Sequence, residues 1–446
     1  RDTMTMDRAA ISGHLEIIEF LHHNGYQCSV VAMDMAASNG HFKVVEYLHH
    51  NRTEGCTNMA MDGAATHGHL DIVRFLHDHR SEGCTVVAMD QAAAHGYLDV
   101  LEYLHRNRTE GFTDEALDLA AMCGHLHIVQ YLHAHLCNGT HDALEEAARH
   151  GHLPIVEYLC KLDIKASIDD AMCLAAFNGH SPVFEYLYRN FQIDVSTEAM
   201  DEAAANGHLS VVDFLHRNRT EGCTTHAMDM AARNGHLSVV HFLHFNRSEG
   251  STEEAMDMAA LNGHVSIMEF LHQQRGAICT EQTIEDSAAN GHLHVLEFIK
   301  ASYGHFELAS VAHAMRKAIT NAHLDVVEFL HSHFPAQVNE RTSFMDQAVM
   351  CDHVDIVEFF HRIGHHCLGE SFNQAASHGS FAVVRFLTEH TTTQCTPKAL
   401  RLAATNGHRL VVQYLMMERR PNVIGGLGNA IRDATDPHIL CFLKQF

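Results

Sequence analysis

The sequence lacks any hydrophobic run long enough to cross a membrane. A transmembrane helix needs roughly 18 or more consecutive apolar residues, and no stretch of this 446-residue chain approaches that length. No signal peptide is recognisable either. Because the chain begins with Arg1 rather than with Met, we expect an N-terminal portion to be missing from it.

Basic residues are scarce. Lys and Arg total 30 against 55 Asp and Glu, so the formal net charge is -25 at pH 7. A field of that sign repels phosphate groups, and the composition therefore predicts neither nucleic acid nor an anionic membrane surface as a partner. We expect protein partners instead, including any with a basic surface, which this charge would attract.

Motifs for catalysis are also lacking. The chain contains no G-x-S-x-G, no H-E-x-x-H, no P-loop and no Rossmann G-x-G-x-x-G. The glycine cluster at Gly425, Gly426 and Gly428 has neither the preceding strand nor the third spaced glycine of a dinucleotide-binding turn. The sequence predicts neither an enzyme nor a bound cofactor.

An internal repeat of about 28 residues runs through the whole chain. It is marked by a glycine that usually precedes His, at Gly13, Gly40, Gly68, Gly96, Gly124, Gly151, Gly179, Gly207, Gly235, Gly263, Gly291, Gly379 and Gly407. Ala322 and Asp352 replace this glycine in two repeats. We predict one array over residues 1–446, with fifteen clear repeats and a degenerate one at about 422–446, hence about sixteen in all.

Each repeat predicts two helices. Thr57 is a good N-cap for a short first helix, whose small apolar face is alanine-rich, and Gly68 ends that helix. Residues 70–76 supply an apolar face at helical spacing for the second helix. A pair this small cannot bury its apolar face alone, so successive pairs must stack into an all-α solenoid.

The segment "ALRLAATNGHRLVVQYLM", preceded by Thr396 and Pro397, resembles an ankyrin repeat. The resemblance extends over residues 1–446 because the same order of helix, glycine and helix recurs throughout. Ankyrin repeats typically have about 33 residues, so we expect shortened loops here in place of full β-hairpin fingers. Asp also replaces the first-helix histidine of the family, as at Asp34 and Asp62, and must take over its hydrogen bonds.

The resemblance implies a non-enzymatic scaffold or adaptor that binds proteins along the concave face of the solenoid. The contact positions should vary while the frame stays constant, and the position two residues before the marker glycine does so. It supplies seven candidate partner-binding residues: Thr66, Met122, Arg149, Phe177, Arg233, Leu261 and Met350. The alternative function is the recognition arm of a larger regulatory or ubiquitin-ligase-like protein. A monomer is expected in either case.

Forty-three histidines raise the question of metal binding. Most recur either after the marker glycine or at the end of the second helix, so equivalent rings on stacked repeats should lie roughly 10 Å apart. One zinc ion needs its nitrogen ligands at about 2.0–2.1 Å. Hydrogen-bonded loop or interface histidines are therefore the better interpretation, and a pH-sensitive array is a second hypothesis.

The thirteen cysteines form no C-x-x-C pair, and seven of them share one phase of the repeat. A residue that recurs with the repeat fills a packing position, so we expect reduced thiols and an intracellular protein, in the cytoplasm or the nucleus. The repeated first-helix aspartates should cap loop N–H groups or pair with arginines such as Arg52 and Arg80.

The spacing becomes irregular at about residues 292–378, where the marker glycine is lost twice. Neutral drift explains this change most simply. The functional alternative is a local change of curvature, or a longer loop that contacts a partner.

Overall fold

The computed structural model describes residues 3–135, 137, 140–162, 167–191, 196–220, 222–303, 308–335, 343–366, 369–391, 396–417 and 425–446. These residues contain helices and no strand. The chain forms two compact units, an N-terminal unit of residues Arg1–Ala227 and a C-terminal unit of residues Met228–Phe446. The prediction of an all-α fold, with short connections in place of β-hairpin fingers, is confirmed for the described residues.

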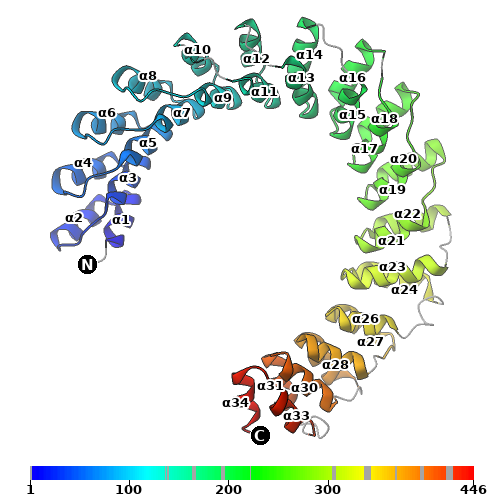
Figure 1. Ribbon diagram of the computed structural model, residues 1–446. Coiled ribbons are helices and arrows are strands. Elements are labelled where there is room, and N and C mark those ends of the chain that lie inside the picture. The colour runs from blue at the N-terminus through cyan, green and yellow to red at the C-terminus, as the bar shows by residue number, and fades with distance from the viewer. Residues whose placement is uncertain are drawn as a thin grey trace. The chain divides into compact units, whose positions relative to one another are not determined.

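The N-terminal unit is a stack of helix pairs. Its first helices are α1 (Met4–Ile11), α3 (Val30–Ser38), α5 (Asn58–Thr66), α7 (Val86–Ala94), α9 (Glu115–Met122), α11 (Asp142–Arg149), α13 (Ile168–Phe177) and α15 (Thr197–Ala205). Its second helices are α2 (Leu15–His23), α4 (Phe42–Asn51), α6 (Leu70–His79), α8 (Leu98–Asn107), α10 (Leu126–Ala134), α12 (Leu153–Leu159) with the 3₁₀ turn η1 (Cys160–Leu162), α14 (Ser181–Asn190) and α16 (Leu209–Asn218). Within this unit the first helices lie along the inner side of its curve (Figure 1).

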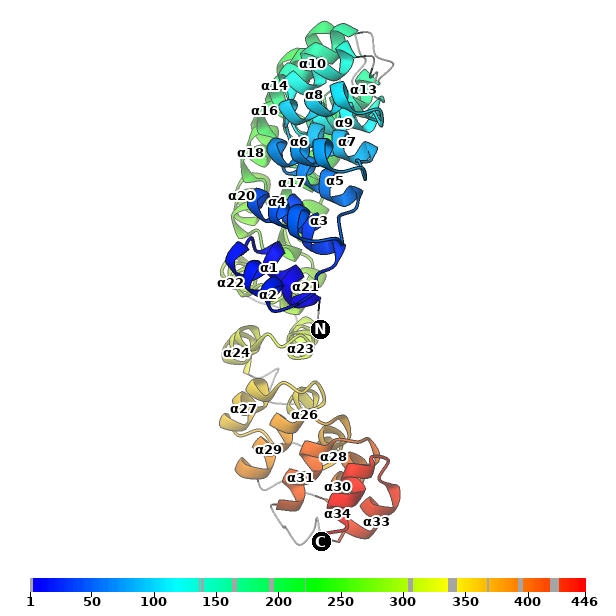
Figure 2. The same cartoon turned by 90° about the vertical axis from the view of Figure 1, so that its left-hand side faces the viewer.

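The C-terminal unit repeats the same pairing, and the boundary between the units falls in α17 (Thr225–Arg233). Its further first helices are α19 (Glu254–Leu261), α21 (Glu281–Ala289), α23 (Leu308–Thr320), α26 (Ser343–Met350), α28 (Gly369–His378), α30 (Pro397–Thr405) and α33 (Leu427–Asp433). Its second helices are α18 (Leu237–Asn246), α20 (Val265–Arg275), α22 (Leu293–Tyr303), α24 (Leu324–His333), α27 (Val354–Arg362), α29 (Phe381–His390), α31 (Arg409–Met417) and α34 (Pro437–Leu443). From α23 to α31 the first and second helices form two separate rows (Figure 2).

Alanine and methionine in the first helices, and branched residues in the second, form the core. Ala64 and Ala65 are fully buried, and their small side chains let neighbouring first helices approach closely. Ile72 and Val73 of the paired second helix are also fully buried. Because each pair seals its apolar face against the next one, stability comes from contacts between neighbouring repeats.

A carboxylate from the preceding repeat fixes the start of most first helices. Asp34 Oδ1 accepts a hydrogen bond from the backbone N–H of Thr57 at 2.7 Å, and its Oδ2 accepts one from the Thr57 hydroxyl at 2.8 Å. The Thr57 hydroxyl oxygen in turn accepts from the N–H of Met59 and caps α5. The expectation that these aspartates cap loop N–H groups is confirmed.

The alternative pairing of the aspartates with arginines is wrong for Arg52 and Arg80. Arg52 and Arg80 instead form ion pairs with the glutamates two residues further on in their own loops, Glu54 and Glu82. The Arg-Thr-Glu and Arg-Ser-Glu sequences place both charges in one tight turn.

The marker position requires a left-handed backbone. Gly151 has φ +76°, and the residues that replace glycine elsewhere, Ala322 and Asp352, keep φ at +64° and +63°. Side chains make this conformation unfavourable. The two substituted repeats therefore retain the turn at an energetic cost rather than abandoning it.

The irregular stretch contains a longer helix. The first helix α23 has 13 residues, whereas α21 before it has 9, so part of the extra sequence extends the helix itself. Residues 304–307 and 336–342, where a longer contact loop was expected, lie outside the described residues, as do residues 422–424 of the last repeat.

Candidate partner-binding surface

The seven candidate residues share one structural position. Each is the last residue of a first helix: Thr66 of α5, Met122 of α9, Arg149 of α11, Phe177 of α13, Arg233 of α17, Leu261 of α19 and Met350 of α26. The helix ends there because the glycine-type turn follows two residues later. The position lies on the same side of each helix pair, since the turn has the same geometry in each repeat.

Most of these side chains are exposed. Phe177 is 48%, Leu261 39% and Met350 51% exposed, which is high for large apolar residues. Arg149 and Arg233 are also exposed, whereas Met122 and Thr66 are half-buried. The Thr66 hydroxyl donates to the carbonyl of Asp62 at 2.8 Å within its own helix, which makes it the weakest candidate of the seven.

Histidines of the following repeat hold the backbone at this position. The carbonyl oxygens of Arg149 and Phe177 lie 2.9 Å and 2.7 Å from the Nε2 atoms of His180 and His208. The carbonyl oxygen of Met122 lies 2.9 Å from Nε2 of the equivalent histidine in the following repeat, His152. The backbone is therefore tied down while the side chain stays free to vary. These histidines are hydrogen-bonded interface residues, as the sequence predicted.

In the N-terminal unit, three candidates stand on successive first helices. Met122, Arg149 and Phe177 are the last residues of α9, α11 and α13, and these three helices lie along the inner side of the unit (Figure 1). The Arg149 guanidinium lies 3.1 Å from Glu146 in its own helix, which orients its head without burying it. We call these three residues the α9–α13 row. It combines two apolar side chains with a cation between them.

In the C-terminal unit, a cavity opens between two first helices beside Leu261. It has a volume of about 200 Å³ and is lined by residues of α19 and α21, with the N-cap of α21: Glu254, Asp257, Met258, Leu261, Thr280, Gln282, Thr283 and Asp286. We call this cavity the α19–α21 groove. Sequence reasoning found only Leu261 of this set.

The helix α21 departs from the repeat at the groove. Thr283 and Ser287 occupy positions that are alanine in α19, and Glu285 and Asp286 replace an aspartate and a methionine. Thr283 and Ser287 are buried, and the Thr283 hydroxyl donates a hydrogen bond to the Asp257 carboxylate of α19. These substitutions are visible in the sequence as a break in the repeat pattern, which is the signal that could have located the groove.

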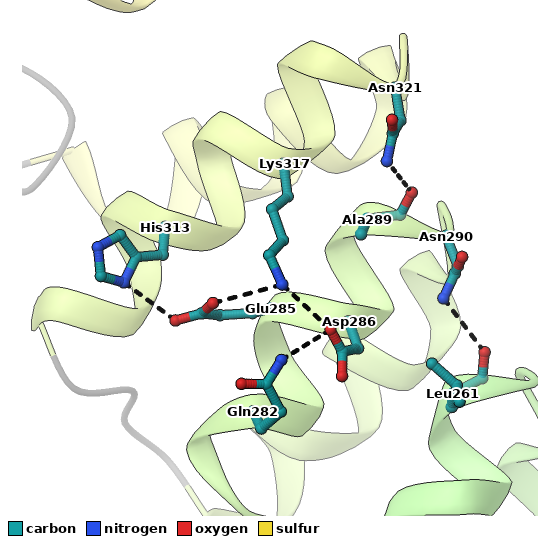
Figure 3. A network of polar contacts seen from close by, with 9 residues as sticks. All are labelled: Leu261, Gln282, Glu285, Asp286, Ala289, Asn290, His313, Lys317 and Asn321. Carbon is teal, nitrogen blue, oxygen red and sulfur yellow. Dashed lines mark hydrogen bonds and ion pairs between the residues drawn. The ribbon is translucent and has the colours of Figure 1, made fainter.

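A network of charges joins α21 to α23 (Figure 3). Lys317 of α23 lies 3.1 Å from Asp286 and 3.5 Å from Glu285, and the second oxygen of Glu285 lies 3.0 Å from His313. Gln282 donates to Asp286 at 2.8 Å. Burial lowers the pKa of Lys317, but the neighbouring carboxylates of Asp286 and Glu285 outweigh it and raise the pKa above its ordinary value, so the lysine stays charged and holds the two acidic side chains in place.

The repeated cysteines occupy a packing position. Cys56 and Cys84 are buried free thiols, and burial raises the pKa of each to about 11. A thiol with so high a pKa is a poor nucleophile at neutral pH, because the thiolate is the reactive form. Cys367 and Cys395, which share the same repeat phase, lie outside the described residues.

The part of the chain that the structure describes lacks the features of a metal site and of a membrane span. No group of three or more His, Cys, Asp or Glu side chains there could hold a metal ion. No helix in the same residues is both long and apolar enough to span a bilayer.

Stacked helix pairs, with a constant buried frame and a variable exposed row, define an α-helical repeat protein. The chain belongs to the ankyrin repeat family. Sequence models of that family match residues 89–170, described as "Ankyrin repeats (3 copies)", and residues 6–49, 61–105, 200–244 and 228–272, described as "Ankyrin repeats (many copies)". Together they cover just over half of the chain. No curated protein matches the sequence significantly.

The solved structures that resemble this chain include pentatricopeptide repeat proteins. The crystal structure of PPR10 from maize is 11% identical, with a TM-score of 0.31 over 100% of this chain and 75% of that chain. PPR10 in complex with an 18-nt psaJ RNA element is 9% identical, with a TM-score of 0.29 over 99% of this chain and 83% of that chain. Scores this low carry no argument about what this chain binds.

The exclusion of nucleic acid as a partner needs correction. It rested on the net charge of -25 alone. The physical reason is that net charge is a sum over the chain, whereas binding depends on the charge of one local face. The kind of partner that the chain binds therefore depends on the charge and shape of its individual surfaces.

Proposed function

We propose that this chain is a scaffold or adaptor that binds a partner protein along the exposed ends of its first helices. The observation that carries the proposal is the α9–α13 row, in which Met122, Arg149 and Phe177 project from a backbone held by the next repeat. Large apolar and arginine side chains on a rigid frame are the residues that dominate binding energy in protein interfaces.

Preorganisation supports the same proposal. Each carbonyl in the row already has a hydrogen-bond partner, so a ligand need not order the backbone on binding. Less conformational entropy is then lost on association. Phe177, at 48% exposed, would bury much of its ring against a partner.

Quantitative proximity labelling or pull-down, with the intact chain as bait, tests the proposal. The test variant carries Met122→Ala, Arg149→Ala and Phe177→Ala. We expect specifically enriched proteins to lose about tenfold or more of their enrichment, since loss of about 1.4 kcal/mol weakens binding tenfold and anchor residues commonly contribute more.

The matched control changes the second-helix side of the same repeats. It carries Gln130→Ala, Lys161→Ala and Arg189→Ala, all of which are exposed. Arg189 pairs with Glu185 at 2.8 Å, much as Arg149 pairs with Glu146. The control should keep the enrichment of the wild type. Equal losses in both variants, or no specific enrichment by the wild type, would reject the proposal.

The proposal assigns binding rather than catalysis to this chain, and it places the protein inside the cell. Buried thiols with raised pKa values, such as those of Cys56 and Cys84, support a reducing environment because they pack as apolar side chains. Imaging of the tagged full-length protein in fixed cells tests the location. A signal confined to the secretory pathway would contradict it.

A further inference from the structure

The α19–α21 groove has the shape and charge of a site for one long side chain. Its volume of about 200 Å³ is well below the roughly 300 Å³ and more of small-molecule pockets. Met258 and the 39%-exposed Leu261 supply its apolar surface. The groove therefore suits an extended aliphatic chain better than a ring system.

All the charged residues that line the groove are carboxylates. Glu254, Asp257 and Asp286 all line it, and none of its eight lining residues is a cation. Lys317 reaches Asp286 from outside the lining, but the same ammonium group also serves Glu285 at 3.5 Å. One lysine thus offsets part of the charge of several carboxylates, and the groove keeps an excess of negative charge.

Glu254 is the carboxylate most available to a ligand. Its side chain is exposed and lies in the first turn of α19, whereas Asp257 accepts from Thr280 and Thr283, and Asp286 accepts from Gln282 and Lys317. A cation that enters between the helices would meet Glu254 without breaking an existing contact. It would also approach the Asp257 and Asp286 carboxylates.

A second, larger cavity adjoins the groove at Thr280, which lines both. It has a volume of about 590 Å³, and its lining includes Ile278, two carboxylates, Glu253 and Glu281, and one cation, Arg275. Ile278 is 69% exposed, so an apolar surface lies beside the acidic one. A polypeptide that crossed both cavities would meet an apolar contact and then an acidic slot.

We propose that the α19–α21 groove binds a lysine or arginine side chain of a partner polypeptide, next to an aliphatic residue that packs on Ile278. The aliphatic stem of the basic side chain lies over Met258 and Leu261, and its head contacts Glu254. This inference rests on the proposed protein-binding function and names the partner chemistry at one place in the C-terminal unit.

Selection of a random 12-residue peptide library, displayed on phage, against the immobilised full-length chain tests the inference. We expect enriched peptides to contain Lys or Arg close to Leu, Ile or Met. Synthetic versions of the enriched peptides should bind about tenfold more weakly to Glu254→Gln and to Leu261→Ala, as expected for the loss of a charge-assisted contact or an apolar anchor. Replacement of the basic residue of a peptide by glutamine should weaken its binding to the wild-type chain by a similar factor.

The control variant is Glu269→Gln, which removes an exposed carboxylate from the second helix of the same repeat, α20. It should leave peptide affinity unchanged, and all three variants should melt like the wild type. An 18-nt single-stranded RNA serves as a second probe. The inference is overturned if no peptide is enriched, if enriched peptides lack a basic residue, if Glu254→Gln and Leu261→Ala bind like the wild type, or if RNA binding depends on these two residues. The proposed protein-binding function is tested separately by the triple variant of the α9–α13 row. If that variant loses partner enrichment while the groove variants bind peptides like the wild type, the groove inference fails and the protein-binding function stands.

Discussion

Replacement of the marker Gly151 by alanine should destabilise the repeat array far more than the same change at another left-handed glycine. Gly151 has φ +76°, and a Cβ there would lie 2.5 Å from Nδ1 of His180 in the next repeat. Gly111 has φ +77°, but a Cβ there meets nothing within 4 Å. The two positions therefore share the backbone strain and differ in the steric conflict.

The expected free energies follow from these contacts. The left-handed conformation costs about 1–2 kcal/mol for alanine, and Gly111→Ala should lose only that. Gly151→Ala must in addition displace the His180 ring, at about 1–3 kcal/mol for overpacking. It also weakens the hydrogen bond of His180 to the Arg149 carbonyl, worth about 0.5–1.5 kcal/mol. We expect the two variants to differ by about 1.5–4.5 kcal/mol.

Urea denaturation followed by circular dichroism measures the difference, and hydrogen exchange of amides in α11–α14 reports it locally, because long repeat arrays can unfold in parts. The double variant Gly151→Ala/His180→Ala should be less destabilised than the sum of its single changes, since removal of the ring removes the conflict. The reasoning is refuted if Gly151→Ala is no worse than Gly111→Ala, or if the double variant is additive.

Three other changes have expected outcomes. Asp90→Ala should destabilise the chain by about 2–4 kcal/mol in urea denaturation, because it leaves the N–H and hydroxyl of Thr113 without their acceptor; Asp90→Asn, which keeps one acceptor, should lose less. Ala322→Gly should stabilise the C-terminal unit by about 1 kcal/mol, since it relieves a φ of +64°, and no gain in the melting midpoint would argue against strain there. Burial lowers the pKa of His49 and His244, so the unfolded chain binds more protons below the ordinary histidine pKa of about 6.5. Their contribution to stability is therefore complete above that pH and is lost as the pH falls toward their folded pKa values, and a melting midpoint that stays flat between pH 7.5 and 5.5 would contradict this.

The fold was predictable because each repeat carries its structural signals locally. Thr57 caps α5, and Gly68 ends its turn with φ +78°, as the sequence indicated. In α15 the N-cap is a serine, Ser196, and the threonine that follows it, Thr197, is the first helical residue. Ser196 precedes Gly207 by the same 11 positions by which Thr57 precedes Gly68, so the repeat register indicates this cap as well.

The candidate surface was predictable only in part. The position two residues before the marker glycine could be identified because it varies within a constant frame, and its side chains are largely exposed. The α19–α21 groove was missed, although Thr283, Glu285 and Asp286 break the repeat pattern. A break of this kind is equally consistent with drift until the distances from Lys317 and Gln282 are known.

The sequence by itself determined the repeat, the two helices of each repeat and the family, because caps, glycine turns and apolar periodicity act within about 28 residues. Only the tertiary structure decided which polar groups of neighbouring repeats meet. It places each first-helix aspartate, such as Asp34, on the cap of the next repeat, and it places His180 on the Arg149 carbonyl. These two pairs join residues 23 and 31 positions apart in sequence, so they form only when one helix pair packs on the next.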